Sequence, residues 1–344
     1  MKILITGGCG FIGSNLAHYF SDAGNDITIL DNLSRQGTEK NLAWLMSQSK
    51  KINYIKGDVR NFSNVSSVCK DQDVIIHTAA QVAVTSSVKN PREDFDINAL
   101  GTFNVLEAAR LSNKNPTVIF FSTNKVYGNN VNNIPLVEKK TRYEFADKKY
   151  ELGVPEDFPT DASEHTPYGV SKYTADLYVR DFFTIYNLPT VAFRCSCMYG
   201  TRQFGTEDQG WLAHFIISSI FDRQLTIYGD GKQVRDVLFV DDVVRLVESC
   251  LAKIGKIKGN AFNIGGGPSN TISLLELISI LEKNLGKKIK YTFSDWRPAD
   301  QKVYISDIRK AEKVIGWRPL TSPEEGVKKL IDWINENREN NLFK

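Results

Sequence analysis

The sequence predicts an α/β fold, with a doubly wound parallel sheet and a smaller C-terminal α/β unit. In the first half of the chain, short apolar runs rich in β-branched residues alternate with amphipathic stretches. A glycine-rich turn directly follows the first run, and after residue 198 the alternation loosens into loops rich in Gly, Gln and Asp. Strands that are apolar throughout are typical of a parallel sheet covered by helices on both faces.

Six apolar runs are the expected strands of the large sheet, and four stretches between them have the apolar spacing of helices. The expected strands are residues 2–6, 26–30, 52–57, 74–80, 117–123 and 190–196. The expected helices of this part are residues 13–23, 61–70, 94–112 and 168–186.

Capping residues mark the starts of three helices. Thr166 and Pro167 suit the N-cap and first turn of a helix. Ser273 with Glu276 forms a capping-box signature, and residues 322–325 repeat it with a proline in the first turn. The sequence therefore predicts helices beginning after residues 166, 273 and 322.

The length of 344 residues suggests two domains. We expect the first to comprise residues 1–198 plus about 232–265, and the second about 199–231 plus 266–344. The second should lie over the mouth of the first.

The charge and cysteine content exclude several classes of protein. Basic and acidic residues number 43 and 40 and are interleaved, which gives no support for nucleic-acid binding. No apolar stretch is long enough to span a membrane, and the N-terminal apolar run is too short for a signal peptide. The five scattered cysteines favour a reducing, cytoplasmic compartment and show no metal-ligand spacing.

The turn after the first strand has the spacing of a dinucleotide site. Gly7, Gly10 and Gly13 permit a tight turn and a close approach of the backbone to a pyrophosphate at a helix N-terminus. Asp31 ends the next strand, where it would bind a ribose diol and repel a 2′-phosphate, so NAD is favoured over NADP. Because Arg35 lies nearby in the sequence, the preference for NAD over NADP is not absolute. The alternative is a purely structural glycine turn.

Two further segments fit the same cofactor. Asp58 follows the third strand, where it could meet the adenine amino group or belong to a plain loop. Small residues at 77–84 leave room for the second half of a dinucleotide. We interpret His77 in this segment as a packed strand residue rather than a catalyst.

Tyr168 and Lys172 lie one turn apart at the start of a predicted helix. A free tyrosine has a pKa of about 10, too high for a base near neutrality. A lysine ammonium, a helix N-terminus and an oxidised nicotinamide would each lower that pKa. The pair therefore predicts a general base for an alcohol proton.

The glycine motif, "STNKVYG" at 122–128 and "YGVSK" at 168–172 together resemble the extended short-chain dehydrogenase/reductase superfamily, in its nucleotide-sugar-modifying branch. The resemblance implies a Rossmann-type fold, bound NAD, and Thr123 as the hydroxyl that steadies the reacting oxygen beside Tyr168. It also implies that Lys172 binds the nicotinamide ribose. The expected cofactor-binding residues are Gly7, Gly10, Phe11, Ile12, Gly13, Asp31, Asn32, Ser34, Arg35, Asp58, Val59, Ala79, Ala80, Gln81, Asn98, Tyr168 and Lys172.

Within this branch, two differences from the sequence motifs of known enzymes narrow the choice of reaction. The 4,6-dehydratases have Asp-Glu after the catalytic threonine, but here Asn124 and Lys125 follow it, so the proton carriers for dehydration are missing. The 4-epimerases have an asparagine where this chain has Cys197, which weakens a plain 4-epimerase assignment. The resemblance further implies that Arg235 and Arg297 clamp the diphosphate of a sugar nucleotide. The alternative is that both form surface salt bridges with local aspartates.

The remaining segments resemble the CDP-paratose 2-epimerases, most specifically at "RQFGTEDQGW", residues 202–211. That resemblance implies epimerisation at C2 of a CDP-hexose by transient oxidation, in a homo-oligomer that is a dimer or a tetramer. The expected substrate-binding residues are Gln81, Thr123, Asn124, Lys125, Ser196, Cys197, Arg202, Gln203, Gln209, Arg235 and Arg297. A UDP-sugar 4-epimerase and a non-catalytic NAD-sensing protein stay open as alternatives.

Overall fold

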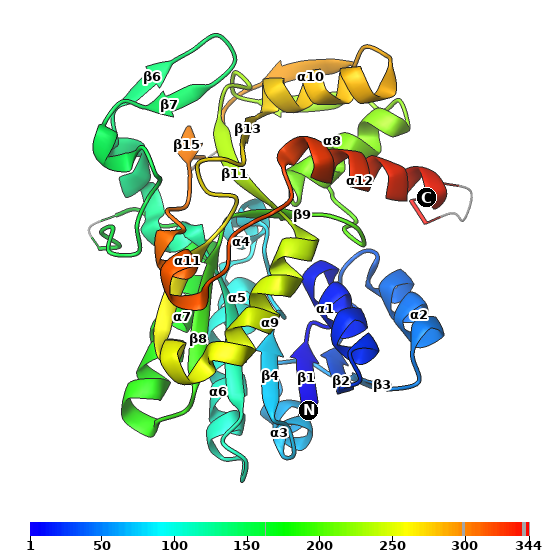
Figure 1. Cartoon of the computed structure of the whole chain (residues 1–344), viewed down its shortest axis with the longest axis vertical. Coiled ribbons are helices and arrows are strands. Elements are labelled where there is room, and N and C mark those ends of the chain that lie inside the picture. The colour runs from blue at the N-terminus through cyan, green and yellow to red at the C-terminus, as the bar shows by residue number, and fades with distance from the viewer. Residues whose placement is uncertain (162, 298–299, 339–341, 344) are drawn as a thin grey trace.

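The computed structural model describes residues 1–161, 163–297, 300–338 and 342–343. Its centre is a parallel seven-stranded sheet in the order β12-β8-β5-β4-β1-β2-β3 (Figure 1). The order reverses between β1 and β4, so a crevice opens there at the carboxyl ends of the strands. The strands are β1 Lys2–Thr6, β2 Asp26–Asp31, β3 Ile52–Lys56, β4 Val74–His77, β5 Thr117–Thr123, β8 Thr190–Cys195 and β12 Asn260–Ile264.

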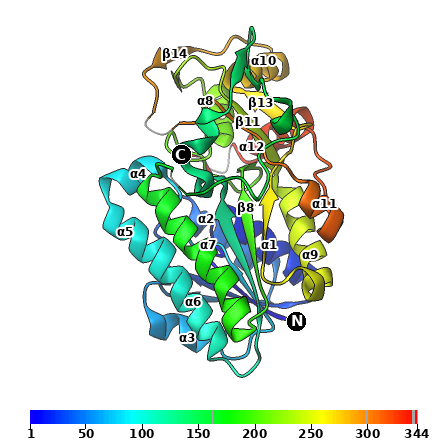
Figure 2. The same cartoon turned by 90° about the vertical axis from the view of Figure 1, so that its left-hand side faces the viewer.

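Helices cover both faces of this sheet (Figure 2). Alternate residues of β1 belong to different cores: Ile3 and Ile5 pack with one set of helices, and Leu4 packs with the other. The first set comprises α1 Phe11–Asp22, α2 Thr38–Gln48, α9 Val240–Ile257 and α11 Arg309–Ile315. The second set comprises α3 Phe62–Cys69, α6 Gly101–Arg110 and α7 Pro167–Tyr186. Burial on both faces explains why the strands are apolar throughout.

All six expected strands are present, and β12 is a seventh that the sequence analysis did not identify. The expected helix over 94–112 consists of three pieces: α5 Pro91–Phe95, a π-helical turn η1 Asp96–Leu100, and α6. The sequence analysis also missed α2 and α4, which spans Val84–Lys89.

The upper part of the molecule is built from smaller sheets (Figure 1). Strand β11 Val234–Phe239 pairs with β9 Cys197–Tyr199, β13 Thr271–Ser273 and β15 Val303–Tyr304. Strands β10 Leu225–Tyr228 and β14 Tyr291–Ser294 form a second pair, and β6 Leu136–Glu138 and β7 Tyr143–Phe145 a third. Short 3-10 segments are η2 Asn124–Asn133 and η3 Lys148–Tyr150.

Three helices complete the upper part around their own apolar core. They are α8 Trp211–Ile220, α10 Leu274–Leu285 and α12 Pro323–Glu336. The predicted caps are confirmed: Ser273 and Glu276 form a capping box, and Ser322 accepts a hydrogen bond from the Glu325 N–H. This part stands over the carboxyl ends of the large sheet (Figure 1).

Candidate active site

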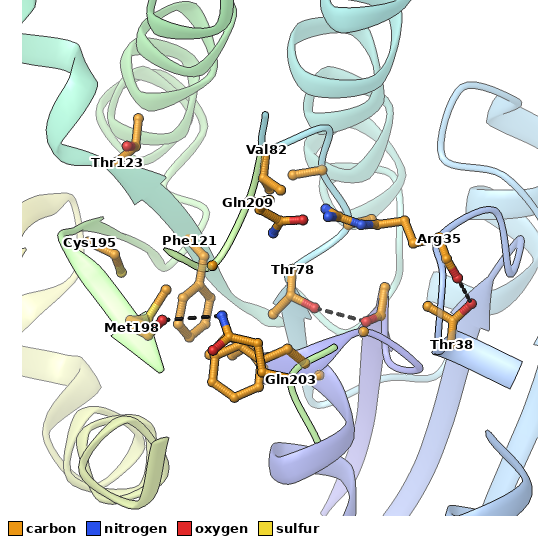
Figure 3. A pocket seen from close by; sticks show the side chains of 18 of the residues that line it. Arg35, Thr38, Thr78, Val82, Phe121, Thr123, Cys195, Met198, Gln203 and Gln209 are labelled. Atoms are coloured by element: carbon orange, nitrogen blue, oxygen red, sulfur yellow. Dashed lines mark hydrogen bonds between the residues drawn. The ribbon is translucent and has the colours of Figure 1, made fainter. Parts of the chain in front are cut away.

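A cavity of about 400 Å³ lies where the carboxyl ends of the large sheet meet the upper part of the molecule (Figure 3). Its lining runs from the glycine turn and the ends of β2 and β3, past the ends of β5 and β8, to the start of α8. Most of the predicted site residues therefore share a single cavity. A volume of this size is typical of a site for a small molecule or cofactor.

The glycine turn packs too closely against neighbouring backbone to carry side chains. Gly7 has a φ of +70°, and a Cβ there would lie 2.6 Å from the Ala79 nitrogen. A Cβ on Gly13 would lie 2.3 Å from the carbonyl oxygen of Gly7. Gly10 is the N-cap of α1 and has no side chain to cap the helix, so the first N–H groups of α1 open on the cavity. This cradle fits a pyrophosphate.

Asp31 ends β2 in the position expected for a ribose ligand. Its carboxylate accepts hydrogen bonds from the backbone N–H groups of Cys9 (3.0 Å) and Leu33 (2.8 Å). Burial raises the pKa of the Asp31 carboxyl, and these two donors act in the opposite direction. The carboxylate is thus fixed in place at the edge of the cavity, as a ribose diol requires.

The other polar residues of this end also line the cavity. Arg60 holds Asp58 in an ion pair at 2.7 Å and, as the main cause, lowers the pKa of Asp58 to about 2. Asn32 donates a further hydrogen bond to Asp58. The Arg35 side chain extends across the opening from the loop after β2 (Figure 3). The remaining predicted cofactor residues on this lining are Phe11, Ile12, Ser34, Val59, Ala79 and Ala80.

The residues that the sequence analysis expects to be catalytic lie around the carboxyl end of β5. Tyr168 lies in the first turn of α7, whose N-cap Thr166 accepts a hydrogen bond from the Gly169 N–H. Thr123 is the last residue of β5, and its hydroxyl lies close enough to the Tyr168 phenol to act on its pKa. Both residues, together with Lys172, line the cavity.

The electrostatics of this group differ from the expectation. Burial raises the pKa of Tyr168 to about 12; the Thr123 hydroxyl and the charge of Arg35 act to lower it, and Asp94 and Cys195 act to raise it further. Burial also lowers the pKa of Lys172 to about 8. The Lys172 Nζ donates a hydrogen bond to the Phe121 carbonyl at 2.6 Å. In the chain alone, burial is therefore the largest influence on the pKa of Tyr168.

Gln81 and Asn98 are not on the cavity lining, although both were predicted cofactor ligands. They bond to each other instead: the Gln81 N–H donates to Asn98 Oδ1 at 2.9 Å, and Asn98 Nδ2 donates to the Gln81 carbonyl at 3.0 Å. Their observed contacts fix the loop that carries Ala79 and Ala80.

The expected sugar end of the cavity is polar but closely packed. Ser196 donates to Asp236, and the Trp211 indole donates to the Cys197 sulfur at 3.5 Å. Burial, followed by the charge of Arg235, lowers the pKa of Lys125 to about 8. The predicted substrate residues on this lining are Thr123, Asn124, Lys125, Ser196, Cys197, Arg202, Gln203 and Gln209.

The two arginines predicted to hold a diphosphate are absent from the lining. Arg235 pairs with Asp300 at 2.6 Å. Arg297 donates to the Glu207 carbonyl at 2.9 Å and lies over the Tyr228 ring at 4.0 Å. Both side chains therefore have intramolecular partners.

Several lining residues were not identified from the sequence, and Asn41 is the most informative. Its Nδ2 donates to the carbonyls of Cys9 (3.1 Å) and Arg202 (3.2 Å), so a single amide connects the glycine turn to the loop before α8. The only signal in the sequence is a polar residue on the buried face of a helix, one turn before Leu45.

His77 is the packed strand residue that the sequence analysis expected. Its ring bonds to the hydroxyls of Thr6 (2.6 Å) and Thr102 (3.0 Å). Among the described residues, there is no cluster of three or more His, Cys, Asp or Glu that could hold a metal ion. None of the helices in that part of the chain is long and apolar enough to cross a membrane. All five cysteines are free thiols.

Comparison with known proteins agrees with this geometry. The family model described as GDP-mannose 4,6 dehydratase matches residues 4–330. The chain is 44% identical over 342 residues to the CDP-paratose 2-epimerase of Salmonella typhi, covering 97% of this chain and 99% of that protein.

Solved structures resemble the whole chain. UDP-glucose 4-epimerase from Thermotoga maritima, determined with UDP-glucose, is 28% identical, with a TM-score of 0.82 and coverage of 98% of this chain and 100% of that one. UDP-glucuronic acid 4-epimerase from Bacillus cereus, determined with UDP-glucuronic acid and NAD, is 29% identical, with a TM-score of 0.81 and coverage of 98% and 99%. With its cofactor cradle and its Thr123–Tyr168–Lys172 group in one cavity, the chain belongs to the GDP-mannose 4,6 dehydratase family of extended short-chain dehydrogenases/reductases.

Proposed function

We propose that the chain is an NAD-dependent epimerase that inverts C2 of a CDP-hexose, converting CDP-paratose to CDP-tyvelose. CDP-glucose and CDP-mannose would be a second substrate pair. The observation that carries the proposal is that Thr123, Tyr168 and Lys172 line one cavity, which continues to the glycine cradle. The printed name of the Salmonella typhi relative supports the choice of carbon and nucleotide.

NAD bound in this cavity would supply the acceptor and donor of the hydride that the reaction needs. Gly7, Gly10 and Gly13 would hold its pyrophosphate and Asp31 its adenosine ribose. The N–H groups at the start of α1 face the cavity with no capping side chain between, and a carboxyl group at Asp31 disfavours a 2′-phosphate. Since the reaction has no net redox change, the cofactor should remain bound through many turnovers.

In the proposed reaction, residues of this chain transfer the proton and stabilise the reacting oxygen. Tyr168 accepts the proton of the C2 hydroxyl as the carbon is oxidised, and returns it when the ketosugar is reduced on its other face. Thr123 donates a hydrogen bond that steadies the reacting oxygen. The Lys172 ammonium, next to Tyr168, favours the phenolate and binds the nicotinamide ribose. Together these groups supply oxidation and re-reduction at one carbon.

Elimination of water would need a further acid and base, and the residues after Thr123 do not provide them. Asn124 Nδ2 donates to Gln301 Oε1 at 3.3 Å, and the next residue is the partly buried Lys125. An amide and an ammonium replace the two carboxyl groups that dehydration uses. This supports epimerisation over dehydration.

The test is incubation of the purified chain with CDP-paratose, CDP-glucose and UDP-glucose, with products identified by NMR. We expect inversion at C2 of a CDP-sugar. Formation of UDP-galactose without change at C2 of either CDP-sugar would replace the proposal with a UDP-sugar 4-epimerase. No turnover of any of these sugars, with NAD still bound, would favour the non-catalytic NAD-sensing alternative.

We also propose that the chain forms a homo-oligomer through an apolar face on α5–α7. Large exposed apolar side chains gather there, and two copies of one face can cover each other. They are Phe95, Phe103, Val170, Leu177, Tyr178 and Ile185. Sedimentation should show a dimer or a tetramer, and Ile185→Glu should shift it toward monomer. An unchanged assembly in this variant would place the interface elsewhere.

The division into a dinucleotide-binding and a substrate-binding domain stays a prediction. The upper sheets, which include β11, would supply the nucleotide-sugar side, although residues 232–239 fall within the range assigned to the first domain. A cytoplasmic location is likewise a proposal, supported by five free thiols.

A further inference from the structure

Asp236, on β11, is a buried carboxylate that the chemistry described above does not use. It has no exposed surface. Its Oδ2 accepts hydrogen bonds from the backbone N–H groups of Ser306 at 3.1 Å and Gly267 at 3.3 Å, and its Oδ1 accepts one from the Ser196 hydroxyl. Burial raises the pKa of Asp236, and these hydrogen bonds act to lower it. Because an N–H group can only donate, the two backbone partners favour an ionised carboxylate.

These contacts lie where the large sheet meets the smaller sheets above it. Ser196 directly follows β8 and Gly267 comes shortly after β12, both strands of the large sheet, whereas Ser306 comes shortly after β15. A Cβ on Gly265 would collide with the Asp236 carboxylate, so this glycine lets the turn after β12 approach it closely. A single carboxylate therefore connects the cavity wall at Ser196 to two other segments of the chain.

Ser196 stands beside the residues proposed to be catalytic. In the pairing of β5 with β8, Thr123 lies opposite Cys195, and Ser196 is the next residue. The Ser196 N–H donates to the Ile264 carbonyl at 2.8 Å, which ties the backbone at this point to β12. Ser196 is partly exposed and lines the same cavity as Thr123 and Tyr168. A sugar held by Thr123 would therefore lie next to the Ser196 wall of the cavity.

The contact with Asp236 decides what the Ser196 hydroxyl can offer to a ligand. A serine hydroxyl carries one hydrogen and two lone pairs. A carboxylate only accepts hydrogen bonds, so the hydrogen of Ser196 is directed at Asp236. The backbone carbonyl oxygen of Asp236, a second acceptor, lies 3.0 Å from the same hydroxyl. The lone pairs of Ser196 are left for the cavity, where they can accept a hydrogen bond but not donate one.

We propose that Asp236 is a positioning residue, which orients the Ser196 hydroxyl as a hydrogen-bond acceptor for one hydroxyl group of the substrate sugar. Asp236 is absent from the cavity lining, so it acts through Ser196. A sugar that carries hydrogen or fluorine in place of that hydroxyl loses the contact. The inference rests on the proposed function, because it takes the Ser196 end of the cavity as the sugar end.

The test is the affinity for a sugar nucleotide compared with the affinity for the nucleotide alone. CDP-glucose and CDP are titrated calorimetrically into the NAD-loaded chain, in a Tyr168→Phe background that prevents turnover. In Asp236→Asn, we expect the Kd of CDP-glucose to rise about 5–10-fold, the value of one hydrogen bond, and the Kd of CDP to stay the same. Asp307→Asn, which alters a buried carboxylate paired with Arg309, should change neither Kd.

Two further variants show whether Asp236 acts through Ser196. Ser196→Ala should raise the Kd of CDP-glucose as Asp236→Asn does, and the double variant should bind no more weakly than either single variant. Additive losses in the double variant would overturn the inference, and so would an unchanged Kd of CDP-glucose in Asp236→Asn. An equal loss of affinity for CDP and CDP-glucose would also overturn it, because a packing role alone affects every ligand of the cavity.

The direction of the hydrogen bond can be tested with Asp236 intact, which decides the matter if circular dichroism shows that Asp236→Asn does not fold. CDP-glucose analogues, with each sugar hydroxyl replaced in turn by hydrogen or by fluorine, are titrated into the chain with and without Ser196→Ala. At one position both replacements should weaken binding equally, since neither can donate, and Ser196→Ala should remove this loss. If the fluorine analogues show no such Ser196-dependent loss at any position, the inference fails.

None of these measurements needs turnover, so their result is separate from that of the proposed reaction. If the chain binds UDP-glucose in place of CDP-glucose, the same comparison with UDP-glucose and UDP tests Asp236, and the proposed function alone fails. If the chain binds neither sugar nucleotide, both fail.

Discussion

Arg235 and Asp300 form an ion pair with 2.6 Å between the guanidinium nitrogen and the carboxylate oxygen. The pair stands beside the cavity, close enough for the charge of Arg235 to lower the pKa of Lys125. If Arg235 binds the substrate diphosphate, it must leave Asp300 to do so.

Substitutions in this pair should therefore change KM more than kcat. Arg235→Ala should raise KM for the CDP-sugar by about 10–100-fold, the value of a charge-assisted hydrogen bond. Asp300→Asn should lower KM a few-fold, because the competing anion is gone. Steady-state kinetics measure both, with Arg309→Ala, an exposed arginine paired to Asp307, as control. An unchanged KM in both test variants would remove Arg235 from the substrate site.

Tyr168→Phe should abolish most of the activity and keep the fold. The phenol moves the proton in the proposed reaction, and general acid–base catalysis contributes about 10²–10⁴-fold. Turnover by NMR should fall in that range, with an unchanged circular dichroism spectrum. Tyr173→Phe is the matched control on the same helix, since its hydroxyl bonds to Thr160. Equal turnover in wild type and Tyr168→Phe would disprove the assigned chemistry.

Gly13→Ala should weaken cofactor binding and lower the stability of the fold. Its new Cβ would meet the backbone of Gly7 and Gly8 at 2.3 and 2.6 Å, and such overpacking costs about 1–3 kcal/mol. Urea unfolding and the NAD content of the purified chain measure the two effects. Gly255→Ala, in α9 with nothing near its Cβ, should instead stabilise by about 0.5–1 kcal/mol.

His77 should make the fold sensitive to acid. Burial, and secondarily the charge of Lys172, lower the pKa of His77 to about 3, whereas an unfolded histidine has a pKa of about 6.5. As pH falls below the unfolded value, the unfolded state gains a proton that the folded state does not. Stability should drop by about 1.4 kcal/mol per pH unit from this group until pH nears 3.

Urea titrations at a series of pH values measure that slope. His77→Gln should lose this part of the pH dependence, while His18→Gln, at a partly exposed ring, should retain it. Identical slopes in wild type and His77→Gln would show that another group causes the acid sensitivity.

The features that the sequence predicted are those whose cause is local. The glycine turn needs its glycines because of neighbouring backbone, and the start of α7 is set by the Thr166–Pro167 pair. Helix α2 was missed because its N-cap is Gly37, with a φ of +86° and no capping side chain. The π-turn at Asp96–Leu100 was missed because an extra residue in a turn leaves the apolar pattern readable as one helix.

Side-chain direction was the least predictable feature. The Arg235 side chain pairs with Asp300, which lies sixty-five positions further along the chain, and so is absent from the cavity lining. No local pattern encodes that contact. The Gln81 side chain bonds to the backbone of Ala83 and is likewise absent from the lining. The sequence analysis also underestimated the burial that raises the pKa of Tyr168, because several elements contribute to it at once.

Strand β12 has a consequence for how the chain is made. It completes the sheet by pairing with β8, yet it follows β8 by sixty-five residues, from Cys195 to Asn260. During synthesis the far side of β8 thus presents an open hydrogen-bonding edge until Asn260–Ile264 leaves the ribosome. Open edges recruit other strands. A pause in translation between these two segments should therefore increase aggregation of the nascent chain.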